Sequence, residues 1–219
     1  MIEPQRQRGI PFVISSPSGG GKTTIFRALQ HYHPEMFYSI SATTRPPRPG
    51  EVDGQDYYFY SPERFERARE SDEFIETAEV HGFNYGTPRG PLLDALAGGR
   101  DIVLDIDVQG GDAIRGSFPD AVLLFIVPPD LETLRERLER RRSEKDEVIA
   151  TRLDNAEREL GRAAEYDYVV VNDDLERTIA EVRAIVLAER CRTTRRLQWL
   201  HNCFPQSLPT PANSEGGEV

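Results

Sequence analysis

The sequence predicts an α/β fold in which a parallel sheet has helices on both of its faces. Apolar runs near residues 12, 102, 122 and 168 alternate with segments of helical periodicity, as in sheets that are buried on both sides. A glycine cluster joins the first run to the first helix, and acidic residues end the second run. Sites in such sheets lie beyond the carboxyl ends of the strands, where both of these features fall.

Composition restricts the class of function. The chain has 219 residues, with 38% hydrophobic and 29% charged side chains, which describes a soluble globular protein. No apolar run approaches the ~20 residues of a membrane span and no signal peptide is evident, so we expect a cytoplasmic protein without a membrane partner. Cys191 and Cys203 lack metal-site spacing and are expected to be free thiols. The net charge of −10 argues against a nucleic-acid partner.

Residues 12–24 predict a strand, a tight turn and the start of a helix. The three glycines of the turn let backbone N–H groups approach an anion closely, with the helix dipole behind them. Lys22 could then reach the outer phosphates of a nucleotide, and the Thr23 hydroxyl could ligate Mg²⁺. Ser16 stands where the general G-x-x-x-x-G-K-[S/T] pattern begins with glycine, so an ordinary glycine-rich loop is the alternative. The flanking strand and helix favour phosphate binding.

Residues 37–88 predict an inserted lobe between the first helix and the second core strand. Residues 37–51 begin like a strand and pass into a loop stiffened by prolines, and residues 57–60 read as a short strand. Ser61 is expected to cap a helix that starts with Pro62 and runs to about residue 70. Residues 72–80 are strand or helix, and residues 82–86 are a turn. Residues 88–97 are a helix closed by two glycines.

The rest of the core continues the alternation of strands and helices. Buried strands are expected at 101–107, 121–127 and 168–171, with a helix capped by Asp130 after the second of them. A very polar segment at 139–147 leads into a further helix, and a long helix is expected from 175 to about 200. Residues 205–219 are rich in Pro, Ser, Gly and Glu and are expected to be disordered.

Charged residues mark three further places. Arg45 and Arg48 stand on the proline-stiffened loop, where guanidinium groups could grip a second phosphate; a solvated loop or a proline-rich ligand for another protein is the alternative. Asp105 and Asp107 end the second core strand. They could position Mg²⁺ through water or hold the loop lysine, and the alternative is that they only initiate the next loop.

An arginine run occupies residues 135–142, with Arg152 one helix further on. Such a run is usually a solvated face. Arg137 and Arg141, however, are four residues apart and share one helical face. A cationic segment between two helices also suits a mobile lid, which could stabilise charge on a migrating phosphoryl group and keep water away.

In combination, these motifs resemble guanylate kinase, the family of ATP:GMP phosphotransferases, from about residue 11 to residue 196. The matching motifs are SPSGGGKT from Ser16, SATTRPPRPGEVDGQDY from Ser41, FIE ending at Glu76, NYGT ending at Thr87, LDIDVQG from Leu104 and VNDD from Val171. The resemblance implies a P-loop NTPase-type core at residues 9–36, 89–134 and 156–200. It also implies a small mixed α/β GMP-binding lobe at 37–88 and a helical lid at 135–155.

The resemblance further implies the reaction, in which the γ-phosphate of Mg·ATP passes in line to GMP and gives ADP and GDP, a step of purine nucleotide metabolism. The implied ATP-binding residues are Ser16, Pro17, Ser18, Gly19, Gly20, Gly21, Lys22, Thr23, Thr24 and, near the adenine, Asn172. The implied GMP-binding residues are Arg45, Arg48, Tyr57 and Tyr85 at the phosphate, and Ser41, Glu76, Thr87 and Asp107 around the guanine. The implied catalytic residues are Lys22, Arg45, Asp105, Arg137, Arg141 and Arg152. Mg²⁺ would be held by Thr23, with Asp105 acting through water.

The choice of guanine has a chemical reason. Guanine N1–H and N2–H₂ are donors, and a carboxylate such as that of Glu76 can accept from both, whereas adenine presents no such edge. A buried carboxylate without its partner should therefore penalise AMP.

The chain also departs from the family. Ser16 replaces the first P-loop glycine, and Ala42 stands where Ser or His is common. The lid reads Arg140-Arg-Arg142 in place of Gly-Arg-Gly, so a stiffer hinge and altered closure kinetics are expected. Two rival functions are an inactive guanylate-kinase-like interaction module, which typically lacks an intact phosphate loop, and a kinase for another nucleoside monophosphate or a phosphorylated sugar.

Overall fold

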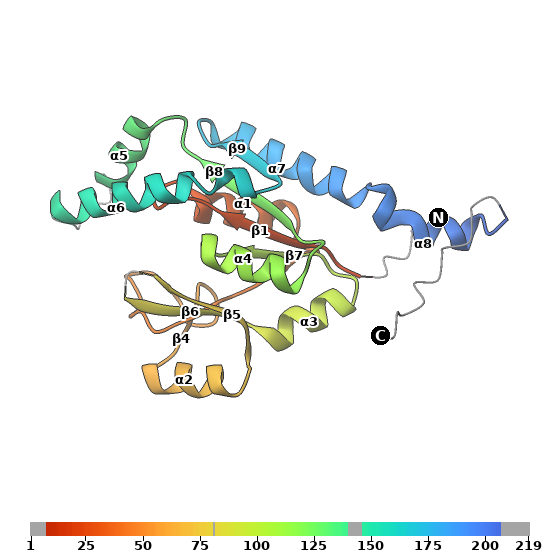
Figure 1. Cartoon of the computed structure of the whole chain (residues 1–219), viewed down its shortest axis with the longest axis horizontal. Coiled ribbons are helices and arrows are strands. Elements are labelled where there is room, and N and C mark those ends of the chain that lie inside the picture. Colours follow the sequence, from red (N-terminus) through yellow and green to blue (C-terminus); the bar gives the residue numbers. More distant parts are fainter. Residues whose placement is uncertain (1–7, 81, 140–145, 207–219) are drawn as a thin grey trace, which may run out of the picture.

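The computed structural model describes residues 8–80, 82–139 and 146–206, and Figure 1 shows how their elements are arranged. The core is a five-stranded sheet with the strand order β2-β7-β1-β8-β9. These strands are β1 (Pro11–Ser15), β2 (Phe37–Tyr38), β7 (Ile102–Asp105), β8 (Val122–Val127) and β9 (Tyr168–Val171). Every neighbouring pair is parallel, which confirms the predicted sheet.

Helices cover both faces of this sheet. Alternate residues of a strand point to opposite faces, so Phe12 and Ile14 belong to one hydrophobic cluster and Val13 to another. The first cluster includes Leu29 of α1 (Lys22–Tyr32) and residues of α7 (Leu175–Arg190). The second includes Leu92 of α3 (Arg89–Ala97) and residues of α4 (Val108–Ser117). The sheet is therefore buried on both faces, so the ends of its strands are the part of it that can form a site.

The second core strand is shorter than predicted. It ends at Asp105, not at residue 107, because the chain turns there into α4, a helix that the sequence analysis did not anticipate. Asp107 is the N-cap of this helix, and its Oδ1 accepts a hydrogen bond from Gly110 N at 2.9 Å.

The inserted lobe has its own four-stranded sheet, with the order β4-β3-β6-β5. Its strands are β3 (Ala42–Thr43), β4 (Tyr58–Phe59), β5 (Phe74–Val80) and β6 (Phe83–Pro88), and the helix α2 (Pro62–Glu70) packs on them through Phe65 and Ala68. Ser61 caps α2 by accepting from Arg64 N at 3.2 Å, as predicted. Figure 1 shows the lobe below the core sheet, with α3 beside the two.

Two features of the lobe differ from the prediction. Residues 82–86 were expected to be a turn, which is wrong, because β6 begins directly after Gly82 (φ 78°) and pairs antiparallel with β5. Phe37 and Tyr38, assigned to the lobe, pair with β7 and form the edge of the core sheet. Residues 72–80, left open between strand and helix, contain the strand β5.

The helices α5 (Leu131–Glu139) and α6 (Asp146–Leu160) lie at one end of the molecule (Figure 1). They pack together through Leu134, Leu138, Leu153 and Ala156. A short 3₁₀ helix, η1 (Ala163–Glu165), leads from α6 to β9. The hinge arginines Arg140, Arg141 and Arg142 lie outside the described residues, so the expectation of a stiffer hinge stays a prediction.

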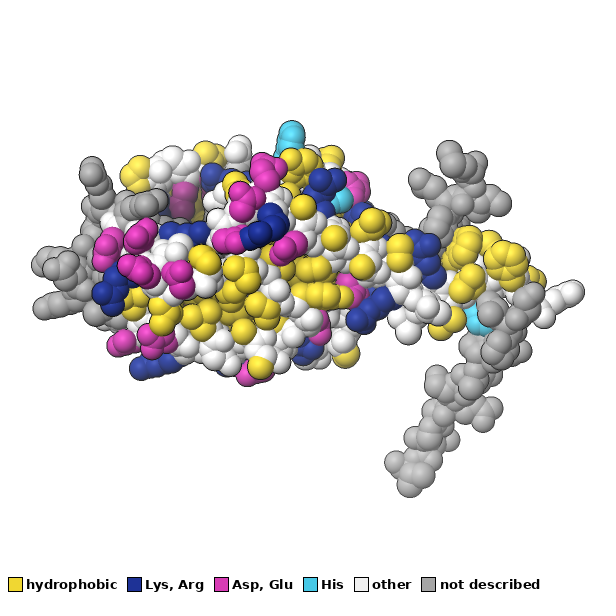
Figure 2. Space-filling model, turned by 90° about the horizontal axis from the view of Figure 1, so that it is seen from above, with side chains coloured by type: hydrophobic (Ala, Val, Ile, Leu, Met, Phe, Trp, Pro, Cys, Tyr) yellow, Lys and Arg dark blue, Asp and Glu magenta, His cyan; other side chains and the backbone are white. Residues whose placement is uncertain are grey.

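The single long helix predicted from residue 175 is wrong, because the chain forms two helices, α7 and α8 (Thr193–Cys203). Between them Arg192 has an extended backbone (φ −54°, ψ 135°). Arg192 lies 3.1 Å from the buried carboxylate of Glu189, and the break also brings Arg195, six residues along the chain, to within 3.3 Å of it. The pair with Arg195 favours the bend, because a continuous helix would hold residues 189 and 195 apart. Figure 2 shows hydrophobic side chains on the surface at the end of the molecule that α8 forms.

None of the helices within the described ranges is both long and apolar enough to cross a membrane. Of the tail predicted to be disordered, residues 207–219 lie outside the described residues.

Candidate active site

The loop between β1 and α1 has the backbone of an anion-binding turn. Gly19 and Gly21 have φ angles of 89° and 95°, in the left-handed region that favours glycine. A Cβ atom at Gly21 would also lie 2.2 Å from Asn172 Nδ2. Because α1 begins at Lys22, the positive end of its dipole lies at this loop.

Three other elements brace the loop. Asn172, which follows β9, donates from Nδ2 to Gly20 O at 2.8 Å. A Cβ atom at Gly19 would lie 3.0 Å from Leu134, so α5 packs directly on the loop. From α6, Glu159 accepts a hydrogen bond from the backbone N–H of Ser18 at 3.3 Å. Asn172 thus supports the loop itself, and its contact with adenine stays a prediction.

Lys22 joins the loop to the end of β7. Its Nζ lies 2.7 Å from Asp105 Oδ1 and donates to Ile106 O at 2.9 Å. The two residues meet because β1 and β7 are neighbours, with Ile14 opposite Asp105. The carboxyl ends of adjacent parallel strands thus place a cation and a carboxylate side by side, where the sequence predicted a site.

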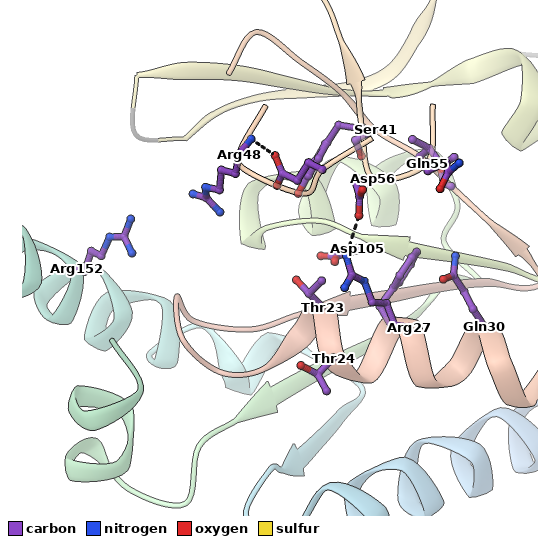
Figure 3. A pocket seen from close by; sticks show the side chains of 15 residues that line it. Thr23, Thr24, Arg27, Gln30, Ser41, Arg48, Gln55, Asp56, Asp105 and Arg152 are labelled. Carbon is purple, nitrogen blue, oxygen red and sulfur yellow. Dashed lines mark hydrogen bonds and ion pairs between the residues drawn. The ribbon is translucent and has the colours of Figure 1, made fainter. Parts of the chain in front are cut away.

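A cleft of about 520 Å³ opens beyond these strand ends, between α1 and the lobe (Figure 3). Its volume is in the range of small-molecule pockets. The predicted site residues that line it are Thr23, Thr24, Ser41, Arg48, Tyr57, Asp105 and Arg152. Figure 3 shows Arg48 of the lobe and Arg152 of α6 extending toward the same side of the cleft.

Glu51 organises the two arginines of the lobe. Arg45 Nη2 donates to Glu51 Oε1 at 2.8 Å, and Arg48 N donates to Glu51 Oε2 at 2.7 Å. Burial alone would raise the pKa of Glu51, but the hydrogen bonds and charges of the two arginines lower it. The carboxylate therefore stays ionised and holds the loop in one conformation. Sequence reasoning missed this role, although Glu51 follows Arg48 by three residues within a motif it had noted.

Arg45 is itself buried, with 8% of its surface exposed. Its guanidinium carbon lies 5.3 Å from the ring centroid of Tyr57, and the rings of Tyr57 and Tyr85 are 6.0 Å apart. Burial raises the pKa of Tyr57, so its hydroxyl remains a hydrogen-bond donor. Two guanidinium groups and two phenol hydroxyls are thus gathered on one part of the lobe, a set of donors that suits a phosphate.

A smaller cavity of about 170 Å³ shares Ser41, Tyr57 and Asp105 with the cleft. Glu76 lines this cavity and is only 7% exposed. Thr87 Oγ1 donates to Glu76 Oε1 at 2.5 Å, which fixes the carboxylate. Burial raises the pKa of Glu76 to about 7, the negative charge of Asp107 adds to the rise, and the Thr87 hydrogen bond opposes it. A carboxylate held in this way can accept from two adjacent N–H donors of a planar ligand.

The three predicted lid arginines differ in position. Arg152 lines the cleft, whereas Arg137 Nη2 donates to Asn172 O at 2.8 Å. In this conformation Arg137 thus lies beside Asn172, the residue that supports the P-loop. Arg141 lies outside the described residues.

Oxygen ligands for a metal ion are present in the cleft. Within the described ranges, no cluster of three or more His, Cys, Asp or Glu side chains could hold a metal ion by itself. The Thr23 hydroxyl and the Asp105 carboxylate both line the cleft. A single hydroxyl and a carboxylate suit Mg²⁺ that arrives with phosphate and water ligands, so the residues fit that ion.

Comparison with known proteins gives a consistent result. A family model described as guanylate kinase matches residues 8–189. A guanylate kinase of Symbiobacterium thermophilum is 50% identical over 192 residues, covering 88% of this chain and 91% of its own length. One from Maricaulis maris is 48% identical over 196 residues, with 89% of each chain covered. The crystal structure of guanylate kinase from Anaplasma phagocytophilum has a TM-score of 0.76 at 35% identity, covering 93% of this chain and 99% of that one.

Proposed function

Because the chain belongs to the guanylate kinase family, we propose that its two phosphate-binding regions and the cavity at Glu76 carry out transfer of the γ-phosphate of ATP to GMP. The protein is a nucleoside monophosphate kinase, and its products are ADP and GDP. The observation that carries the residue assignment is Glu76, a buried carboxylate fixed by Thr87 and facing a small cavity beside the cleft.

The proposed ATP site is the loop at residues 16–24. Its backbone N–H groups and the dipole of α1 would receive phosphate oxygens. When ATP binds, the Lys22 ammonium group would leave Asp105 for a phosphate oxygen or contact both groups at once. Thr23 and Asp105 would hold Mg²⁺, which when bound supplies charge neutralisation on the phosphates.

The proposed GMP site lies in the lobe. Arg45, Arg48, Tyr57 and Tyr85 would bind the phosphate, and Glu51 holds the Arg45 guanidinium group and the backbone at Arg48. Ser41, Glu76, Thr87 and Asp107 would surround the guanine. Of these, Glu76 would accept from guanine N1–H and N2–H₂, a pairing that adenine cannot make.

The proposed chemistry needs positioning and charge stabilisation, with no covalent enzyme intermediate. The GMP phosphate would attack the γ-phosphorus in line. Arg137, Arg141 and Arg152, in the lid at 135–155, would stabilise charge on the migrating group. For Arg137 this requires release from Asn172 O. The core would comprise 9–38, 89–134 and 156–200, because β2 belongs to the core sheet, and the lobe would comprise 39–88. The two cysteines are free thiols, which supports a cytoplasmic location.

The test is Glu76→Gln. The variant keeps the shape of the side chain but loses the negative charge that two guanine donors require. GMP binding should weaken about 10²-fold, while ATP binding should stay unchanged. Glu79→Gln, at an exposed position of the same strand, is the matched control. Wild-type GMP affinity in Glu76→Gln would contradict the assignment.

A further inference from the structure

Glu159 is a charged group in contact with the P-loop that the mechanism above does not use. It lies near the end of α6, on the helix that also carries Arg152. Its Oε2 accepts a hydrogen bond from the backbone N–H of Ser18 at 3.3 Å. The two residues are 141 positions apart in the chain, so the contact is made by the fold and not by local structure.

The position of this carboxylate matters because of what the loop binds. Ser18 belongs to the loop whose N–H groups would receive phosphate oxygens. Among the residues that the structure describes, no other carboxylate accepts a hydrogen bond from a backbone N–H of that loop. A carboxylate resembles a phosphoryl group in charge and in its oxygen acceptors. A phosphate bound at the Ser18 N–H would therefore compete with Glu159 for that donor.

The surroundings of Glu159 disfavour its ionised carboxylate. Burial raises the pKa of Glu159, and among the described residues the Ser18 hydrogen bond and the positive charge of Lys22 oppose that rise. Asp107 adds a further negative charge nearby. A phosphate that took over the Ser18 N–H and Lys22 would remove both supports and would also repel the carboxylate.

We propose that Glu159 acts as an internal anion that occupies part of the phosphate cradle and is displaced when ATP binds. Because Glu159 and Arg152 are seven residues apart on α6, they lie on the same side of the helix. A shift of α6 that withdraws Glu159 from the loop also moves Arg152 at the cleft. Glu159 is thus a positioning residue that connects occupation of the P-loop to α6, the helix whose first part, up to residue 155, belongs to the proposed lid. This inference rests on the proposed assignment of the loop as the ATP site.

The test compares Glu159→Gln with Glu157→Gln. The first substitution keeps the shape and the ability to accept from Ser18 but removes the charge. The second removes the same charge from an exposed position on the same helix. Calorimetry with ATP and with inorganic tripolyphosphate should show about tenfold tighter binding to Glu159→Gln, since a charged hydrogen-bond competitor has been removed. Affinities for adenosine and GMP should not change, and the KM for ATP should fall while the KM for GMP stays constant.

Unchanged or weaker ATP binding to Glu159→Gln would overturn the proposal, and so would an equal gain in Glu157→Gln. Glu159→Ala should tighten ATP binding in the same direction, so the proposal remains testable if one variant folds poorly. Lys22→Ala distinguishes a failure of this inference from a failure of the proposed ATP site on which it rests. If wild-type protein and Lys22→Ala bind ATP equally well, the assignment of the loop fails, whatever the Glu159 variants do.

Discussion

Lys22 Nζ lies 2.7 Å from Asp105 Oδ1, at the point where two neighbouring parallel strands end. The pair is partly exposed, with 20% and 18% of the two side chains accessible; Asp105 lines the cleft, and both residues line the smaller cavity beside it. A cation held by a carboxylate at the mouth of a ligand cleft is preorganised for an anionic ligand, because it has already lost most of its rotational freedom.

Replacing Lys22 should therefore affect catalysis more than folding. Lys22→Ala is expected to lower kcat about 10²–10³-fold, because the charge that would stabilise the transferred phosphoryl group is lost. Steady-state kinetics with GMP and ATP measure the effect. Arg183→Ala removes a cation that stacks on Tyr32 away from the cleft, and it should leave kcat unchanged. A kcat in Lys22→Ala within a factor of about three of the wild type would contradict this role.

Binding of GMP should depend on pH through Glu76. Its pKa is raised from 4.5 to about 7, so the carboxyl must lose a proton before it can accept from both guanine donors. GMP binding is expected to strengthen as pH rises through about 7 and to level off above it. The dissociation constant measured between about pH 5.5 and about pH 8.5 tests this.

The GMP phosphate also titrates in that range, with a second pKa of about 6. Glu76→Gln keeps the phosphate titration and removes that of the carboxyl, so it is the control. Identical pH profiles for the wild type and Glu76→Gln would show that Glu76 does not control guanine binding.

Gly21→Ala should disrupt the P-loop. The residue has a φ of 95°, and a Cβ there would lie 2.2 Å from Asn172 Nδ2, so either the loop or Asn172 must move. ATP binding is expected to fall at least about tenfold, while GMP binding persists. Gly116→Ala, in α4, meets no atom within 4 Å and should keep ATP affinity and stabilise the protein by up to about 1 kcal/mol. Calorimetric titration compares the two, and unchanged ATP affinity in Gly21→Ala would refute the tight packing of this loop.

Asp101 should be important for stability. Its buried carboxylate accepts from Ile10 N at 3.0 Å and pairs with Arg190 Nε at 2.6 Å, which ties α7 to the start of β7. Asp101→Ala leaves a largely buried arginine without this partner and is expected to cost about 3–5 kcal/mol in the free energy of unfolding. Glu66→Ala breaks an exposed pair with Arg69 and should cost less than about 1 kcal/mol. Urea unfolding measures both, and similar midpoints for the two variants would contradict the prediction.

The features that the sequence predicted best are those with local signals. The strand-turn-helix pattern predicts the P-loop, and the rule for parallel sheets places Asp105 beside it. Glu76 has no such signal, because a lone glutamate on a strand usually faces solvent; only the resemblance to a family predicts a role for it. Its burial arises from pairing of β5 with β6, which brings Thr87 to it, and from α4 on its other side.

The errors of prediction have tertiary causes. No glycine or proline marks the break between α7 and α8; the chain bends where Arg195 pairs with the buried carboxylate of Glu189, six residues earlier. Residues 83–86 contain turn-forming types but become a strand because β5 provides a partner along their whole length. Glu159 lies in the amphipathic helix α6 and reads as a solvated residue, since its contact is far away in the sequence.

The central claim is that this protein phosphorylates GMP and selects it through Glu76. The most direct measurement is ADP production from Mg·ATP with GMP, AMP, CMP and UMP offered separately, with Lys22→Ala as the control. We expect rapid turnover with GMP alone, lost in Lys22→Ala. Comparable turnover with AMP or a pyrimidine nucleotide would contradict the role of Glu76 while leaving the kinase fold in place. No turnover with any acceptor would contradict the catalytic account as a whole.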